Sequence, residues 1–109
     1  MKLIISIIHS DDVGVLLRGL EQKGHRCTKI STTGGFLREG NATVLIGAEA
    51  DQVDAILEIV RENCHTRTQL VSPLPPLAEA GEFLVPKPVE VQVGGATVFV
   101  LDIEHSARF

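Results

Sequence analysis

Residues 32–41 read TTGGFLREGN and concentrate the groups that could hold a nucleotide. Gly34 and Gly35 allow backbone N–H groups to approach a ligand closely, and consecutive N–H groups in such a turn form an anion-binding nest. Phe36 offers a flat apolar face for a base, and Arg38 offers a guanidinium fork for a phosphate. The segment therefore predicts a site for an anionic ligand with a planar ring. An ordinary turn between two strands is the alternative interpretation of its glycines.

The charge around this loop favours a small anion over a nucleic acid. The chain has a formal net charge of −4, whereas a general nucleic-acid binder normally presents a basic face. No acidic residue lies between Gly24 and Arg38, and the basic side chains of this region are His25, Arg26, Lys29 and Arg38. We therefore expect a local positive field on an acidic body and no nucleic-acid partner.

The elements that must position the loop follow from the spacing of hydrophobic residues. Apolar and β-branched runs predict strands at residues 2–8, 25–31 and 41–48. Two amphipathic helices are predicted from i, i+3, i+4, i+7 spacing. Their apolar stripes are Val13, Leu16, Leu17 and Leu20 in the first helix and Val53, Ile56, Leu57, Val60 and Cys64 in the second. Ser10 and Asp51 are the expected N-caps, and Gly24 is expected to end the first helix.

The last third of the chain predicts a loop and a hairpin. Residues 67–71 fit a short strand, and residues 72–88 contain all five prolines, which indicates a long loop. Residues 89–103 predict a hairpin with Gly94-Gly95 as its two-residue turn. The repeated β-α-β order predicts one domain over residues 1–109, a ferredoxin-like βαββαβ α+β sandwich with an extra C-terminal hairpin strand.

This architecture predicts self-association. Two amphipathic helices cover only one face of such a sheet, whereas the strands at 2–8 and 43–48 are apolar on both faces. The uncovered face would then expose a large apolar patch, which monomeric proteins avoid. We therefore expect a homo-oligomer that buries the open face of the sheet.

Several function classes are disfavoured. Cys27 and Cys64 form no C-x-x-C pair, and without a signal peptide they are expected to be free thiols in the cytoplasm. No apolar run reaches membrane length, so no membrane partner is expected. The four histidines lack metal-ligand spacing, which predicts no metal site. No paired acid and base, no activated nucleophile and no P-loop is present, so we expect no enzyme.

Five segments together carry a family pattern: RCTK at 26–29, TTGGFLR at 32–38, GN at 40–41, QLVSP at 69–73 and VEVQVGGATVFVL at 89–101. They resemble the PII-like cyclic di-AMP receptor family, over essentially the whole chain. The resemblance implies a non-enzymatic homotrimer without a cofactor, which binds the second messenger cyclic di-AMP in clefts between subunits. It also implies that binding orders two loops and passes the signal to an unknown downstream protein.

The resemblance also implies which residues contact the ligand. Gly35 is added for its place in the anion-binding turn, and Arg108 is added for the phosphate contact that its guanidinium would offer. The full candidate set is Arg26, Thr28, Gly35, Phe36, Leu37, Asn41, Gly47 and Arg108. In this set Arg26 would meet a phosphate, Phe36 would cover an adenine, and Asn41 would read a base edge. Thr28 would offer its hydroxyl, and Gly47 would leave room for the ring or lend a backbone N–H.

The chain departs from the family pattern at two positions. Gly24 stands where relatives carry an asparagine, and the lost amide is a possible adenine contact worth about 1–3 kcal/mol. Arg108 stands where relatives carry a glutamine, and it would either add a phosphate contact or point into solvent. Two alternatives therefore stay open: a PII-like trimer that senses another adenine nucleotide such as ATP or AMP, and a structural or metal-tolerance trimer without nucleotide.

Overall fold

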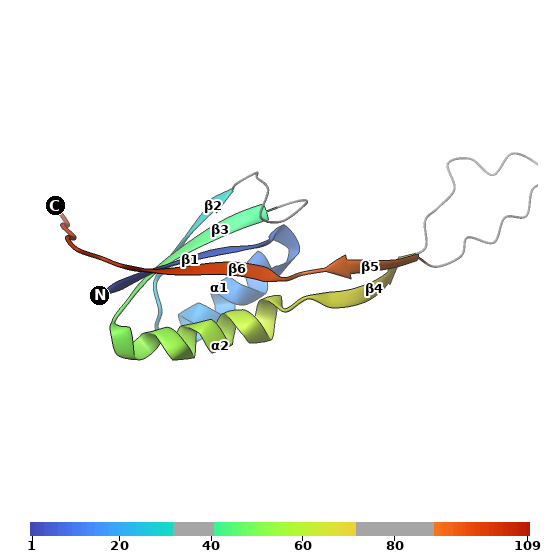
Figure 1. Cartoon of the computed structure of the whole chain (residues 1–109), viewed down its shortest axis with the longest axis horizontal. Helices are drawn as coiled ribbons and strands as arrows, with labels where there is room; N and C mark the ends of the chain where they lie inside the picture. The colour runs from blue at the N-terminus through green and yellow to red at the C-terminus, as the bar shows by residue number, and fades with distance from the viewer. Residues whose placement is uncertain (32–40, 72–88) are drawn as a thin grey trace, which may run out of the picture.

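The computed structural model describes residues 1–31, 41–71 and 89–109 (Figure 1). The predicted nucleotide loop at 32–40 and the proline-rich loop at 72–88 lie outside this part of the chain. The elements follow in the order β1 (Lys2–His9), the 3-10 turn η1 (Ser10–Asp12), α1 (Val13–Gln22), β2 (Cys27–Ser31), β3 (Asn41–Ala48), the 3-10 turn η2 (Ala50–Gln52), α2 (Val53–Cys64), β4 (Arg67–Val71), β5 (Val89–Val93) and β6 (Ala96–Asp102).

Four strands form the main sheet, in the order β2-β3-β1-β6, with antiparallel pairing throughout. At the middle of the sheet, Ile4 of β1 lies opposite Ile46 of β3 on one side and Val100 of β6 on the other. The two apolar strands are therefore the inner ones, as their sequences predict. With its two helices, the fold is α+β and compatible with the ferredoxin-like arrangement.

The predicted hairpin at residues 89–103 is wrong. β5 pairs with β4, with Val91 opposite Gln69, whereas β6 pairs with β1. Gly94 and Gly95 do have the positive φ angles, +80° and +95°, that a two-residue turn requires. Instead of reversing the chain, they carry it on from one sheet into the other. The N–H of Gly95 donates to the carbonyl of Cys64 at the end of α2, which directs β5 alongside β4.

Both helices lie on one face of the sheet (Figure 1). Their apolar stripes meet the even-numbered side chains of β1 and β3, as the spacing predicts. The buried apolar core consists of Ile4, Ile8, Val13, Leu16, Leu20, Ala42, Val44, Ile46, Ala48, Ile56, Val60 and Cys64. Within the described part of the chain, no helix has the length and apolar character needed to cross a membrane.

The helix ends differ partly from the prediction. Ser10 and Asp51 are not N-caps, because they lie inside the 3-10 turns that precede the α-helices, and the N-caps of these turns are His9 and Glu49. The imidazole Nδ1 of His9 accepts from the N–H of Asp11 at 3.3 Å and so takes the role expected of Ser10. Gly24 ends α1 as predicted: its φ is +80°, and the next N–H, of His25, donates to the carbonyl of Leu20 at 2.9 Å.

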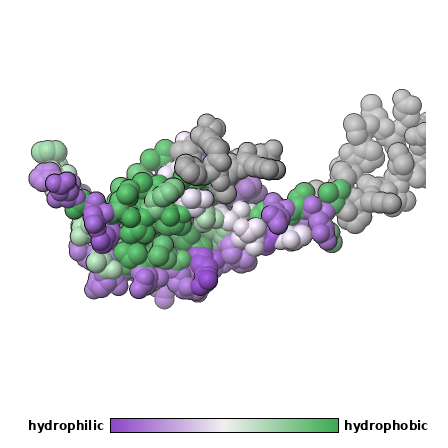
Figure 2. Space-filling view, in the orientation of Figure 1, coloured by the Kyte–Doolittle hydropathy of each residue, from purple (hydrophilic) through white to green (hydrophobic). Residues whose placement is uncertain are grey.

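The opposite face of the sheet has no helix over it. Its central row, read across the strands, is Thr28, Leu45, Ile5 and Phe99. In β1 the side chains on this face are half-buried, and in β6 Phe99 and Leu101 are 40% and 46% exposed. Figure 2 shows a continuous hydrophobic area where Figure 1 places β6 and the neighbouring sheet, bordered by hydrophilic residues along α2. The predicted apolar open face is therefore present.

β4 and β5 form a separate two-stranded ribbon, which we call the arm (Figure 1). It extends away from the four-stranded sheet and the helices, which we call the body. Leu70 and Val89 on the arm are 65% and 49% exposed. The chain passes between body and arm twice, at residues 65–66 and at residues 94–95.

Candidate functional site

The predicted ligand residues that the structure describes lie along the open face and at its ends. β3 runs from Asn41 to Ala48 and carries two of them, Asn41 and Gly47. Thr28 lies next to it on β2, opposite Leu45, and its side chain is exposed. Three further members of the set, Gly35, Phe36 and Leu37, fall outside the described residues.

One group of predicted contacts lies at the C-terminal end of β3. Gly47 pairs with Leu3 of β1, and Arg26 directly precedes β2, whose first residue Cys27 lies opposite Ile46, the neighbour of Gly47. Arg26 is exposed, so its guanidinium is available to an anion. A Cβ built on Gly47 would meet nothing within 4 Å. Packing within one chain therefore does not require glycine at this position, and the space beside it is open to a ligand or a neighbouring chain.

The second group lies at the opposite end of the same strand. Asn41 is the first residue of β3 and pairs with His9, the last residue of β1, on the open face. Its side chain is buried, with a relative exposure of 9%. Six residues of extended chain separate Asn41 from Gly47, which corresponds to about 20 Å. One base or one phosphate therefore does not reach both residues in a single chain.

Arg108 lies in the extended tail that follows β6. The tail leaves the sheet at the Gly47 end, because Lys2 pairs with Asp102 of β6 and with Ala48 of β3. Ile103 donates its N–H to the carbonyl of Met1 at 3.1 Å, and the residues beyond it are exposed. Within the described chain the structure does not bring Arg108 against the other predicted contacts.

The backbone conformation at position 24 explains why the residue there is a glycine. Its φ of +80° is in the left-handed region, where glycine is favoured and asparagine is the best tolerated side-chain residue. A Cβ there would meet nothing within 4 Å. The asparagine that the family pattern implies at this position therefore fits the same backbone.

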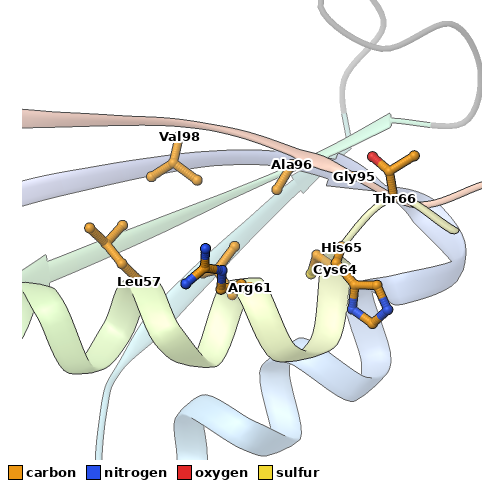
Figure 3. A pocket seen from close by; sticks show the side chains of 9 residues that line it. Leu57, Arg61, Cys64, His65, Thr66, Gly95, Ala96 and Val98 are labelled. Atoms are coloured by element: carbon orange, nitrogen blue, oxygen red, sulfur yellow. The ribbon is translucent and has the colours of Figure 1, made fainter.

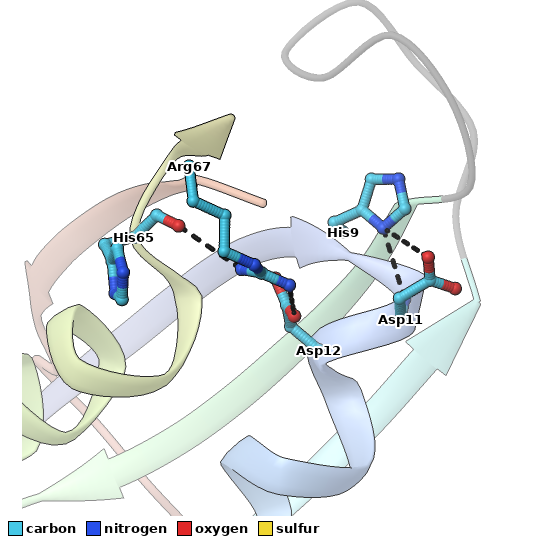
Figure 4. A network of polar contacts seen from close by, with 5 residues as sticks. All are labelled: His9, Asp11, Asp12, His65 and Arg67. Atoms are coloured by element: carbon cyan, nitrogen blue, oxygen red, sulfur yellow. Dashed lines mark hydrogen bonds and ion pairs between the residues drawn. The ribbon is translucent and has the colours of Figure 1, made fainter. Parts of the chain in front are cut away.

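Sequence reasoning missed a polar network at the junction of arm and body (Figure 4). Arg67 of β4 places Nη2 2.8 Å from Oδ1 of Asp12 and Nη1 3.3 Å from Oδ2, in a bidentate pair. The hydrogen bonding that the Arg67 guanidinium donates to the Asp12 carboxylate raises the pKa of Arg67. Fifty-five residues separate the partners, so no local sequence signal connects them.

A cleft of about 280 Å³ lies beside this junction, between α2 and β6 (Figure 3). Its lining residues are Leu57, Val60, Arg61, Cys64, His65, Thr66, Gly95, Ala96 and Val98. Burial, reinforced by the negative charge of Asp12, raises the pKa of the Cys64 thiol to about 12, although Arg67 opposes the shift. Cys64 is therefore a protonated core residue at neutral pH, as its place in the helix stripe predicts.

Comparisons with known proteins identify the family. The model of the cyclic-di-AMP receptor family matches residues 1–109, the whole chain. A crystal structure of a functionally unknown protein from Pediococcus pentosaceus is 40% identical and superposes with a TM-score of 0.79, covering 99% of this chain and 96% of that chain. A cyclic di-AMP ligand fits this match, and the chain belongs to the cyclic-di-AMP receptor family.

Proposed function

We propose that this protein is a non-enzymatic, PII-like receptor that binds cyclic di-AMP between the subunits of a homotrimer. The observation that carries the proposal is the division of the predicted contacts between the two ends of the open face. Arg26 and Gly47 lie at one end and Asn41 lies about 20 Å away at the other. A complete site forms when the Arg26 end of one protomer meets the Asn41 end of its neighbour.

The remaining geometry supports a ring of identical subunits. Within the described residues, the outer edges of β2 and β6 are unpaired, and the open face between them is apolar. A head-to-tail contact joins unlike surfaces of identical chains, and it closes into a ring when the rotation permits. Such a ring buries the open face and creates equivalent clefts at each interface.

In the proposed mechanism the protein binds the nucleotide, binding orders a loop, and the nucleotide is not chemically changed. Arg26 provides a charge-assisted contact to a phosphate, Thr28 adds a hydroxyl, and Asn41 offers both a donor and an acceptor to a base edge. Ligand binding orders residues 32–40 around the base, and the change reaches a downstream protein. A cytoplasmic location belongs to the same proposal, because both cysteines are free thiols.

Calorimetric titration with cyclic di-AMP, cyclic di-GMP and ATP tests the ligand. We expect micromolar or tighter binding of cyclic di-AMP alone. Arg26→Ala should weaken this binding by about 2–3 kcal/mol, the cost of a lost charge-assisted hydrogen bond. Selective ATP binding would instead indicate a sensor of another adenine nucleotide, and no binding of any of the three would indicate a structural trimer.

Subunit complementation tests where the site lies. Arg26→Ala and Asn41→Ala chains are each expected to lose high-affinity binding when assembled alone. When the two are unfolded together and co-assembled in equal amounts, about a quarter of the interfaces in a head-to-tail ring combine an intact Arg26 with an intact Asn41. Titration should then recover about that fraction of wild-type sites. A site contained within one protomer would recover none.

A further inference from the structure

In the described part of the chain, a bidentate ion pair joins the arm to the body. Arg67, the first residue of β4, bonds with both guanidinium nitrogens to the two carboxylate oxygens of Asp12, at 2.8 and 3.3 Å (Figure 4). Its Nη1 also lies 3.4 Å from the carbonyl oxygen of His65. A forked contact of this kind fixes direction as well as distance, because the guanidinium plane must align with the carboxylate.

The two partners are in unequal surroundings. The Asp12 side chain is 6% exposed and belongs to the body, where it ends η1 and precedes α1. The Arg67 side chain is 41% exposed and belongs to the arm. Among the described residues, no other Lys, Arg or N-terminus forms an ion pair with Asp12. Arg67 is therefore the member of the pair that can leave, while Asp12 stays in place.

The Gly94-Gly95 link between β5 and β6 leaves room for this arginine. A Cβ on Gly94 would lie 2.5 Å from Nη1 of Arg67 and 2.7 Å from the carbonyl oxygen of His65. The guanidinium thus occupies the space that a side chain at position 94 would need. The φ of +80° at Gly94 also favours glycine. Both chain passages of the junction, at 65–66 and 94–95, therefore meet around the ion pair.

The pair also lies close to the Asn41 end of the open face. Asp12 ends the turn that begins directly after His9, and His9 is the residue opposite Asn41. Nδ1 of His9 accepts from the N–H of Asp11 at 3.3 Å and lies 3.5 Å from its Oδ2. The strand pair of Asn41 and His9 therefore leads directly into the turn that carries Asp12, the partner of Arg67.

We propose that Asp12 and Arg67 form a latch that sets the orientation of the arm on the body, and that the latch links the arm to the ligand site beside Asn41. The first part stands on the geometry of the junction alone. The second part rests on the proposed function, because it requires a ligand at Asn41. In these roles Asp12 and Arg67 are positioning residues and do not touch the ligand.

Residual dipolar couplings of the nucleotide-free protein test the latch. Arg67→Gln removes the charge and one branch of the fork. Arg61→Gln is the matched control, because Arg61 is 79% exposed on α2 and its ion pair in the described structure is with Glu58 of the same helix. In wild type and in the control, one alignment should fit the amides of β1, β3, β4 and β5. In Arg67→Gln the couplings of β4 and β5 should fall to about half or less, while those of β1 and β3 stay unchanged.

Arg67→Lys keeps the charge and loses the fork, so it should give an intermediate reduction. Unchanged couplings of β1 and β3 show that each variant is folded, which keeps the result interpretable. Arm couplings in Arg67→Gln that equal those of Arg61→Gln would overturn the latch.

Titration of the same variants with cyclic di-AMP tests the link to the site. If the ligand and the latch are coupled, Arg67→Gln should bind at least about fivefold more weakly than wild type, and Arg61→Gln should not. Reduced arm couplings with unchanged affinity would overturn the link and leave both the latch and the proposed function intact. Absence of binding in wild type and in the control would overturn the proposed function and the link, while the latch would still be decided by the dipolar couplings.

Discussion

At the level of single residues, the glycines of this protein differ in whether the surrounding chain leaves room for a side chain. Gly94 is fixed by its own chain, because a side chain there would collide with Arg67 and with a backbone carbonyl. Gly47 and Gly24 have no neighbour within 4 Å of an added Cβ. The space at these two positions is therefore available to a ligand or another subunit.

Gly24→Asn should strengthen cyclic di-AMP binding. The backbone accepts asparagine at φ +80°, and the restored amide provides a contact worth about 1–3 kcal/mol, or roughly tenfold in affinity. Calorimetric titration checks this expectation. Gly24→Ala is the matched control, since it adds the Cβ without the amide and should not strengthen binding. Equal affinities for the two variants would remove position 24 from the site.

Cys64 should make the protein sensitive to alkaline pH. Its folded-state pKa is raised to about 12, whereas an unfolded thiol titrates near 8.5. Between these values the unfolded chain loses a proton that the folded chain keeps, so the free energy of unfolding falls as pH rises. The loss is about 1.4 kcal/mol per pH unit.

Urea unfolding at pH 8, 9 and 10 measures this dependence. In Cys64→Val the side chain stays apolar and cannot ionise, so its stability should decline less steeply over the same range. Parallel declines in wild type and variant would show that the thiol does not control alkaline stability.

At the level of elements, the helix starts rest on short-range contacts. The N–H of Glu49 donates to Oε1 of Gln52 at 3.1 Å and so helps to begin the segment that leads into α2. Gln52→Ala should therefore lower the free energy of unfolding by about 0.5–1 kcal/mol. Thermal or urea unfolding measures the change. Gln22→Ala, at the exposed end of α1, is the control, and an equal effect in both would contradict the capping role.

The sequence predicts the elements of this fold better than their pairing. Periodicity places both helices, because burial on one side imposes a pattern along the chain, and a continuous apolar run places the strand at 41–48. Periodicity does not decide whether Gly94-Gly95 turns the chain back as a hairpin or links two different sheets, since positive φ angles are compatible with both. That choice depends on the hydrogen bond from Gly95 to Cys64, a contact between distant segments. The Asp12–Arg67 pair escapes sequence reasoning for the same reason.

The candidate site residues come from the family resemblance more than from the chemistry of single residues. The resemblance implies Arg26 and Thr28, and the register sets Thr28 and Ile30 on one face of β2 and Cys27 on the other. The separation of Asn41 and Gly47 along β3 becomes informative only once the strand is known to be continuous. The sequence alone does not show that the predicted contacts divide into two groups.

At the level of the whole molecule, the apolar open face is the feature that favours the proposed self-association. A monomer would leave the row of Leu45, Ile5 and Phe99 in contact with water. For the homotrimer proposed above, light scattering of the wild-type protein should give the mass of three chains of 11.8 kDa each. A monomer at micromolar concentration would contradict the proposed assembly.

Ile5→Glu should dissociate the assembly. It places a charge in the centre of the open face, which costs several kcal/mol per subunit if the face is buried between chains. The expected mass is that of one chain, with the helical circular dichroism retained. Val15→Glu is the matched control, since Val15 is 44% exposed on α1, away from the open face. A trimeric Ile5→Glu protein would show that another surface holds the subunits together.

The pairing of Val71 with Val89 brings the two ends of the arm side by side. Because these two residues are directly paired, a two-residue turn in place of residues 72–88 can join β4 to β5. Replacing residues 72–88 with Asn-Gly, which joins adjacent antiparallel strands, should preserve cyclic di-AMP affinity while deleting whatever the intervening peptide contributes to signal output. A different segment between Val71 and Val89 would then link binding of the same second messenger to a different target protein.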